Sequence, residues 1–275
     1  MREKVLFIDC ASGVSGDMLL GALLDLGVPL AALKRELSKL PVGGFRLARS
    51  RGTRGGVSGT HLRVATPRDR GYRHWSDFER ILRQSRLSAE VKPRSLALLR
   101  RLFEVEAEVH GETAESVHLH ELGSLDTLVD VVGAVAGLDH LGVSEVVCSE
   151  VNVGGGYVET EHGRMTVPAP ATALLLKGAP VFSDGEDFER TTPTGALLVT
   201  GLSTRFGAFP GMTLRKIGYG LGTKDPEHSR PNALRLVLGE RDQGGSQTVL
   251  ILEATIDDMT PEQMGYLQER LLEVA

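Results

Sequence analysis

The sequence predicts a mixed α/β protein: one large mixed-sheet domain with flanking helices. Strand-like and helical segments alternate in the first part of the chain, and strand-like segments cluster later. The chain has 275 residues, of which 41% are hydrophobic and 24% charged. This is the balance of an ordinary globular protein, and the chain is long enough to bury a sizeable core.

The first elements are expected to be a strand, a turn and a helix. A short apolar run over residues 5–8 breaks at small residues, and apolar residues then recur at helical spacing over residues 18–26. Residues 45–66 predict two strands around a turn rich in Gly and Arg at residues 52–56. Residues 75–110 show the periodicity of a helix with one buried face.

The second half of the chain is expected to open with a helix that Ser124 caps and that runs to about Leu141. Pro168 and Pro193 stand where two further helices are expected to begin, because proline is well suited to the first helical turn. The remaining expected elements are short strands near Val146 and Val151, strands in residues 211–223, 232–239 and 248–256, and a helix after Thr260.

Residues 239–247, "GERDQGGSQ", have the composition of a linker and predict a domain boundary near residue 243. Residues 1–242 would then form the main domain. Residues 243–275 are too few for a domain of their own, so we interpret them as the start of a C-terminal domain that is truncated or separately encoded.

Composition narrows the classes of protein. The net charge is -5, yet residues 46–101 hold fifteen Lys or Arg and four acids, which suits an anionic ligand or simply a solvated surface. Aromatic residues are 5% of the chain and do not interleave with the arginines, which argues against nucleic-acid binding.

Two cysteines make no disulfide framework, and the first apolar run is too short for a signal peptide or membrane span. We therefore expect a cytoplasmic protein with no membrane partner.

The first candidate site is "DCASGVSGD", residues 9–17, between the first strand and the first helix. Backbone N–H groups and a helix N-terminus can converge there on a carboxylate or phosphate, while the two aspartates supply acceptors or metal ligands. The alternative is a tight turn with an acid in the first helical turn. The candidate substrate-binding residues of this stretch are Asp9, Ser12, Gly13, Ser15, Gly16 and Asp17.

The second candidate site is "VHLHELGSLDTLVD", residues 117–130. His118 and His120 are two residues apart and point the same way on an extended segment, with Glu121 turned to the other side. Imidazole with carboxylate suits nickel, zinc or iron, and the same groups can relay protons near neutral pH. We therefore take His118, His120 and Glu121 as candidate metal ligands, and Glu121, His120 and Asp126 as candidate catalytic groups.

Asp126 and Asp130 are four residues apart on the expected helix and share one face. A structural interpretation stays open, since acids favour a helix N-terminus and the whole stretch can be the polar rim of a core helix. Both candidate sites stand at the ends of elements. We therefore predict one cleft lined by Asp9, Ser12, Asp17, His118 and His120.

Two later clusters add candidates for substrate binding. His162 and Arg164 follow a run of glycines and suit an anionic ligand, although an exposed hairpin explains them equally well. Thr192 and Thr194 surround the expected helix start at Pro193, where a hydroxyl either caps the helix or binds a phosphate.

Six stretches in order resemble the LarC family of nickel insertion proteins: "DCASGVSGDMLLGALLDLG", "HLHELGSLDTLVDVVGA", "VNVGGGYVETEHGRMTVPAPAT", "TTPTGALL", "GYGLGTKD" with "PNALRL", and "LEATIDDMTPEQ". The resemblance implies a nickel chelatase (cyclometallase, lyase class) that inserts Ni(II) into pyridinium-3,5-bisthiocarboxylic acid mononucleotide. The product is the nickel-pincer nucleotide, a cofactor of the lactate racemase type. The resemblance also implies a requirement for CTP with Mn or Mg.

Full-length members of that family continue well past "IDDMTPE", and the additional region carries much of the CTP site. The resemblance thus implies that residues 1–242 are the main nickel-insertion domain and that the C-terminal portion of the family is a partner. Two other functions stay open: a metal-dependent phosphate-ester hydrolase or nucleotidyl transferase, and a non-catalytic nickel-carrying scaffold subunit. A homo-oligomer also stays open.

Overall fold

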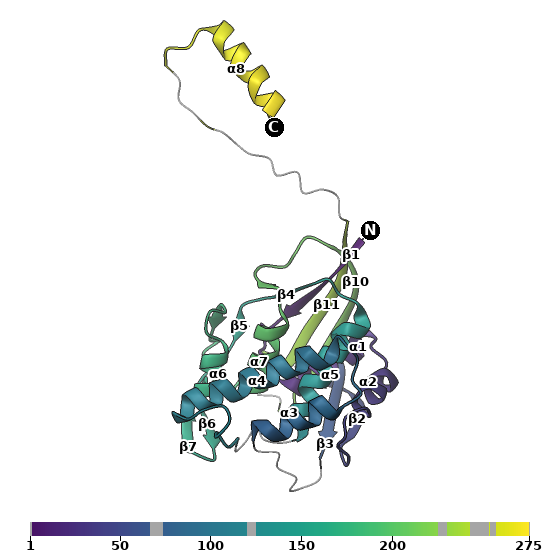
Figure 1. The fold of residues 1–275 in the computed structure, drawn as a ribbon. Coiled ribbons are helices and arrows are strands. Elements are labelled where there is room, and N and C mark those ends of the chain that lie inside the picture. Colours follow the sequence, from purple (N-terminus) through teal and green to yellow (C-terminus); the bar gives the residue numbers. More distant parts are fainter. Residues whose placement is uncertain are drawn as a thin grey trace. The chain divides into compact units, whose positions relative to one another are not determined.

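The computed structural model describes residues 2–66, 74–119, 125–224, 230–242, 253 and 257–274. The chain divides into two compact units, residues 1–242 and residues 243–275. The larger unit combines helices with a large mixed sheet, which confirms the predicted fold class (Figure 1). The assignment of residues 243–275 to the start of a C-terminal domain stays a proposal.

The main sheet has seven strands within the described residues, in the order β2-β3-β10-β11-β1-β4-β9. The strand β1 lies inside the sheet: it pairs antiparallel with β11 and parallel with β4. The strands of this sheet are β1 (Arg2–Asp9), β2 (Arg46–Arg54), β3 (Val57–Ala65), β4 (Glu145–Cys148), β9 (Arg205–Phe206), β10 (Thr213–Leu221) and β11 (Ala233–Asp242). Two small sheets join β5 (Val151–Asn152) to β8 (Val181–Phe182) and β6 (Tyr157–Thr160) to β7 (Gly163–Thr166).

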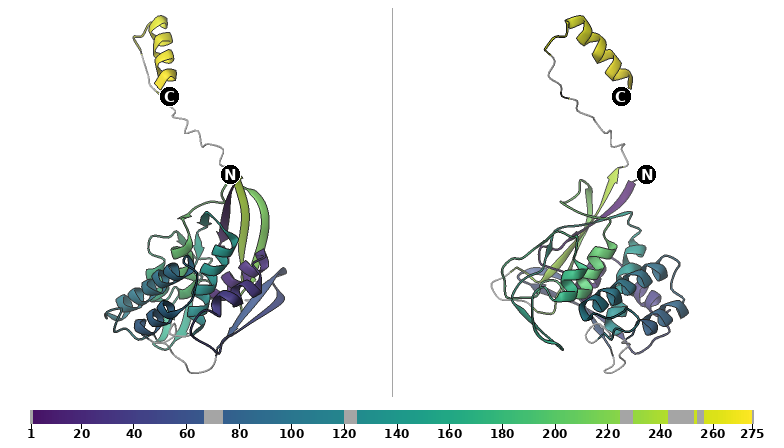
Figure 2. Two further views of the ribbon diagram at one scale, coloured as in Figure 1. Left: turned by 45° about the vertical axis from the view of Figure 1, so that its right-hand side comes forward. Right: turned by 60° about the vertical axis from the view of Figure 1, so that its left-hand side comes forward.

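The helices of the larger unit gather on one side of the sheet (Figure 2). The helix α1 lies directly on β3, β10 and β11, and α5 packs against α1. The helices of the larger unit are α1 (Gly16–Leu26), α2 (Leu30–Leu37), α3 (Trp75–Gln84), α4 (Val91–His110), α5 (Leu125–Leu141), α6 (Pro170–Leu175) and α7 (Pro193–Leu202).

The side-chain alternation of β1 shows why this sheet has two covered faces. Leu6 and Ile8 belong to the large core under the helices, whereas Val5 and Phe7 belong to a small apolar cluster on the opposite face. Phe209 covers that second face, with its ring centroid 4.8 Å from that of Phe7. A strand buried on both faces reads as a continuous apolar run, as residues 5–8 do.

Three expected boundaries were wrong. Residues 75–110 form two helices rather than one stretch, because Ser85 is extended (ψ 161°) and Ser88 accepts a hydrogen bond from the Val91 N–H at the start of α4. The helix α6 begins at Pro170 rather than Pro168, since a proline keeps the preceding residue out of the helical region. The strand β2 extends to Arg54, so the turn is shorter than expected. The helix α2 was not predicted.

Other expectations were confirmed or lie outside the described residues. Pro193 takes the first position of α7, and β10 and β11 match the expected late strands. The Ser124 cap lies outside the described residues, as does the expected strand at 248–256 apart from Glu253.

The expected final helix is α8 (Pro261–Val274), in the smaller unit. Its start is a capping box: the Thr260 N–H donates to Gln263 Oε1 at 2.9 Å, and the Gln263 N–H donates to Thr260 Oγ1 at 3.4 Å. Within the described ranges, no helix combines the length and the apolar character that a membrane crossing requires.

Candidate functional site

The turn that follows β1 is tied to the segment that precedes α7. The Val14 N–H donates to the Arg190 carbonyl at 3.0 Å, and the Thr192 N–H donates to the Val14 carbonyl at 3.1 Å. Ser15 is the residue before α1 and Thr192 is the residue before α7. These two backbone bonds therefore bring the N-termini of α1 and α7 together, although the two segments are far apart in the sequence.

Gly13 is required at this junction. It has φ +81°, and a Cβ at its position would overlap the Arg190 carbonyl oxygen. Any side chain must therefore push the two segments apart, in addition to adopting a backbone conformation that favours glycine.

Gly13→Ala is expected to lower the free energy of unfolding by about 2 to 3 kcal/mol, because a positive φ costs about 1 kcal/mol or more and the overlap adds a similar amount. Urea unfolding of the full chain measures this. Gly56→Ala is the matched control, since Gly56 has φ +80° but no atom within 4 Å of its added Cβ. Equal losses in the two variants would contradict the close packing at Gly13.

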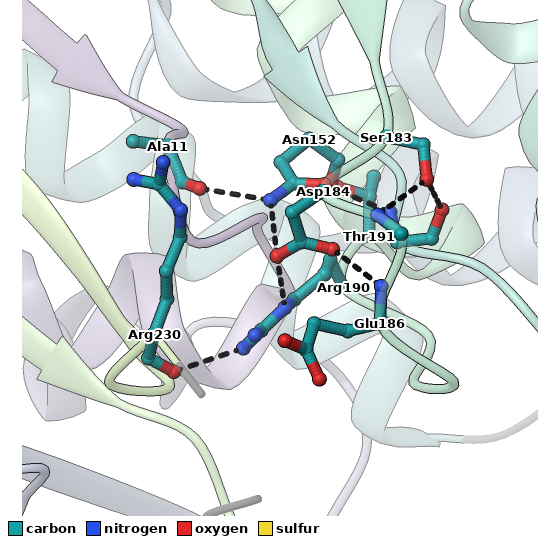
Figure 3. Close-up of polar contacts among 10 residues, drawn as sticks. Ala11, Asn152, Ser183, Asp184, Glu186, Arg190, Thr191 and Arg230 are labelled. Carbon is teal, nitrogen blue, oxygen red and sulfur yellow. Dashed lines mark hydrogen bonds and ion pairs between the residues drawn. The ribbon is translucent and has the colours of Figure 1, made fainter. Parts of the chain in front are cut away.

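A buried ion pair supports the same junction (Figure 3). The Arg190 side chain is fully buried, and its Nε donates to Asp184 Oδ2 at 3.1 Å. Arg190 Nη1 donates to the Arg230 carbonyl at 3.1 Å. Asn152 Nδ2 donates at 2.9 Å both to Asp184 Oδ2 and to the Ala11 carbonyl. One network thus connects the turn after β1, β5 and the segment before α7.

The network also sets the charge of Asp184. Burial alone would raise the pKa of this carboxyl group, but hydrogen bonds from Asn152 and the Glu186 N–H, together with the Arg190 charge, hold the pKa below its ordinary value. Asp184 is therefore ionised at neutral pH and neutralises the buried guanidinium.

A cavity of about 500 Å³ opens beside this junction. Ser15 and Thr192 bring the N-termini of α1 and α7 to its wall, and Lys224 adds a cation. Helix N-termini carry partial positive charge and unpaired N–H groups, so they favour an anion. The volume suits a small-molecule ligand. The other lining residues are Met18, Tyr157, Val158, Glu159, Asp187, Phe188, Glu189, Arg190, Thr223 and Asn232.

The Asp130 carboxyl group meets the first turn of α1, and the charges of Asp17 and Asp126 act on it. A Cβ on Gly16 would overlap Asp130 Oδ2, so the Asp130 carboxyl group lies directly against the helix start. Asp130 Oδ1 is buried and has no hydrogen-bond partner in the described part of the chain. Burial, and then the charges of Asp17 and Asp126, raise the pKa of Asp130 well above its ordinary value. A carboxyl group whose pKa is raised by its surroundings is suited to proton transfer.

The predicted metal ligands are only partly described. His118 Nδ1 lies 3.4 Å from His74 Nε2, and the two rings meet edge to face with centroids 4.9 Å apart. His120 and Glu121 lie outside the described residues. Across the described ranges, no group of three or more His, Cys, Asp or Glu side chains is arranged to hold a metal ion. The metal site around His118 stays a prediction.

The structure brings some predicted substrate-binding residues together. Ser15, Gly16, Asp17 and Thr192 meet at the paired helix N-termini, where the Ser15 hydroxyl donates to Asp17. Thr192 accepts a hydrogen bond from the Gly195 N–H at 3.2 Å and so caps α7. Thr194 is buried in the first turn of the same helix.

Other predicted residues lie elsewhere. Asp9 accepts from Arg235 Nε at 2.9 Å and, with Ser12, lines a separate cavity of about 140 Å³. The predicted cleft shared with His118 and His120 stays a prediction.

On the β6–β7 hairpin, the His162 ring packs against His110 with centroids 5.0 Å apart. The Arg164 guanidinium lies 4.2 Å from the centroid of Tyr157, which lines the 500 Å³ cavity.

Three features of the candidate site were not predicted from the sequence: the choice of Asp130, the contact of His74 with His118, and a buried polar network. The spacing of Asp126 and Asp130 placed them on one face, but it gave no reason to choose Asp130. No local signal pointed to His74, or to the network of Asn152, Asp184 and Arg190, because each depends on contacts between distant segments.

These features define a mixed α/β protein with a cavity of small-molecule size at two helix N-termini and a buried carboxyl group against the first turn of α1. A family model described as "Nickel insertion protein" matches residues 6–275, and the chain belongs to this family.

Curated relatives agree with this assignment. A protein of Geobacter sp. (strain M21) named "Putative nickel insertion protein" is 48% identical over 273 residues, which are 98% of this chain and 70% of the relative. The "Pyridinium-3,5-bisthiocarboxylic acid mononucleotide nickel insertion protein" of Desulfitobacterium hafniense is 42% identical over 277 residues, which cover 98% of this chain and 68% of that protein. No solved structure matches the chain.

Proposed function

We propose that this protein inserts Ni(II) into pyridinium-3,5-bisthiocarboxylic acid mononucleotide, the compound in the name of the Desulfitobacterium hafniense relative. The protein would then act as a cytoplasmic nickel chelatase of the lyase class. The observation that carries the proposal is the 500 Å³ cavity at the paired N-termini of α1 and α7, beside the Asp130 carboxyl group.

The cavity supplies the anion-binding part of the reaction. A mononucleotide carries a phosphate, and the helix starts at Ser15 and Thr192 offer N–H groups, hydroxyls and favourable dipoles for it. Lys224 adds a positive charge at the same wall. The pyridinium ring and its thiocarboxylates would occupy the remaining space toward Tyr157 and Phe188.

The carboxylate group supplies the proton-transfer part. Formation of a nickel–carbon bond on the ring requires removal of a ring C–H proton, which needs a base. Asp130 is suited to this role because its raised pKa makes it a stronger base than an ordinary carboxylate. His120 and Glu121 remain proposed as ligands of nickel during the insertion step, and His120, Glu121 and Asp126 as further acid–base groups.

The CTP requirement belongs to the same proposal. The relatives above extend beyond the matched region, and we infer that CTP with Mn or Mg acts together with that C-terminal portion.

Ser15→Ala is expected to raise the KM for the mononucleotide about tenfold or more, because a hydrogen bond to a charged group contributes about 1.5 to 3 kcal/mol. The fold should persist, since the Ser15 side chain makes no helix-capping bond and its hydroxyl donates to Asp17, two residues away in the same helix start. The assay is nickel-dependent product formation, followed by mass spectrometry, with the chain and the C-terminal portion together.

Ser50→Ala, on an exposed position of β2, is the control and should leave KM unchanged. An unchanged KM in Ser15→Ala would contradict the placement of the phosphate. Release of phosphate from the mononucleotide without nickel incorporation would instead indicate a phosphate-ester hydrolase. Nickel binding without product, even with the C-terminal portion present, would indicate a carrier subunit.

A further inference from the structure

His74 and His118 form an imidazole pair between two separate parts of the chain. His74 is the residue before α3, and His118 lies between α4 and α5. His118 Nδ1 is 3.4 Å from His74 Nε2. His74 is exposed and His118 is half-buried, so the pair can be reached from solvent.

The surrounding core fixes both histidines in place. Trp75 and Phe78 of α3 pack edge to face on Phe103 of α4, with centroid distances of 5.7 and 5.3 Å. Val117 and Leu119 are each 1% exposed, so their burial turns the intervening His118 outward. The pair is thus held by the packing on both of its sides.

The spacing of the two nitrogens matches that of two ligands on one metal ion. Imidazole nitrogens bind first-row ions at about 2.0 to 2.1 Å, which places two adjacent ligand nitrogens about 3.0 to 3.4 Å apart. Imidazole suits nickel among the divalent ions. In the structure the two nitrogens form a hydrogen bond, so one of them carries a proton that points to the other. Metal binding requires this proton to move to the other nitrogen of its ring through solvent and small side-chain rotations to aim both lone pairs at one ion.

We propose that His74 and His118 together bind Ni(II) as an open two-imidazole site, from which nickel passes to the substrate. The inference rests on the proposed function and adds His74 to the predicted ligand His118. A site with only two protein ligands leaves the other coordination positions to water, which the substrate's sulfur atoms can replace. A cargo metal must be released, and two ligands hold it less firmly than a closed site of four.

Nickel titration of the full chain by calorimetry tests the pair. His74→Ala and His118→Ala are each expected to weaken nickel binding about tenfold or more, the scale found when the ligand surroundings of a metal are disturbed. The double variant should lose little more than either single variant, because the two rings act as one unit. His140→Ala, at an exposed position in the last turn of α5, is the matched control and should bind like the wild type.

X-ray absorption of the nickel-loaded protein gives a second readout. The wild type should show two imidazoles on nickel and each single variant one. If an alanine variant fails to fold, by its melting curve, His74→Gln and His118→Gln replace it. Wild-type affinity in His74→Ala, or the same imidazole number in His74→Ala and wild type, would overturn the proposal, as would absence of nickel binding by the wild type.

Product formation by the same preparations separates this proposal from the proposed function. If the wild type forms the nickel product and His74→Ala binds nickel normally, only the two-histidine site is overturned. If nickel binding depends on both histidines but no preparation forms product with the C-terminal portion present, the insertion reaction is overturned and the site is kept.

Discussion

Asp184→Ala is expected to lower the free energy of unfolding by about 3 to 5 kcal/mol, because it leaves the buried Arg190 guanidinium without its counter-ion. The side chains of Arg190 and Asp184 are 0% and 8% exposed, so the guanidinium is shielded from bulk water and depends on the carboxylate for its neutralisation. Chemical denaturation with urea at pH 7 measures the change. The loss should also loosen the cavity wall, since Arg190 lines the cavity and its carbonyl accepts from the Val14 N–H.

A paired substitution separates the ion pair from the packing around it. Asp184→Leu with Arg190→Met removes both charges and should be much less destabilising than either single change, because no buried charge is left unpaired. Arg83→Met, in which the Arg side chain is 69% exposed beside a Glu79 side chain that is 32% exposed, is the control for an exposed pair and should cost less than about 1 kcal/mol. A loss of that small size in Asp184→Ala would contradict the importance of the network.

The pH dependence of this variant has a definite sign. The folded-state pKa of Asp184 is lowered, so its stabilising contribution is fully present above the unfolded pKa of about 3.9 and is lost as the pH falls through the folded pKa. The difference in unfolding free energy between wild type and Asp184→Ala should therefore be constant from pH 7 down to about pH 5 and shrink below about pH 4.

The elements of this fold were predictable where the signal is local. The strand β1 and the helix α1 follow from a short apolar run, a helical repeat and a terminal Gly27 at φ +117°. The break between α3 and α4 was not predictable from periodicity, since apolar residues continue through it and serine hydroxyls decide the ends. Local chemistry thus sets the boundaries that hydrophobic patterns leave open.

In the candidate site, too, the features that depend on local sequence were predictable and those that depend on contacts between distant segments were not. The sequence placed Ser15, Asp17 and Thr192 at helix starts, and the structure confirms those positions. That α1 and α7 start side by side depends on backbone bonds between Val14, Arg190 and Thr192, which a local pattern does not encode. The contact of Asp130 with Gly16 is of the same kind, because it requires α5 to pack on α1.

Asp130→Asn is expected to reduce nickel-dependent product formation about 10²- to 10⁴-fold, the range that a positioned base contributes. The same change should leave the free energy of unfolding at pH 7.5 equal or higher. The folded-state pKa of Asp130 is raised, so ionisation of this buried group opposes folding, and the penalty grows as the pH rises from the unfolded pKa to the folded pKa. Asparagine has no charge and removes that penalty.

Opposite signs of the two effects are the decisive result. If Asp130 served only the fold, Asp130→Asn would lower both the free energy of unfolding and the activity. If Asp130 is a base that is buried for its chemistry at a cost to the fold, the substitution lowers the activity and does not lower the free energy of unfolding. Asp139→Asn, at an exposed position near the end of α5, should change neither quantity.

In the wild type, the acid limb of the kcat/KM profile should lie above the pH of about 4 at which an ordinary carboxyl group titrates, because burial and the charges of Asp17 and Asp126 raise the pKa of Asp130. Full activity in Asp130→Asn would contradict this role of Asp130. The base would then be Glu121 if the acid limb lies at that ordinary pH, or His120 if it lies near pH 6.5, where an ordinary imidazole titrates.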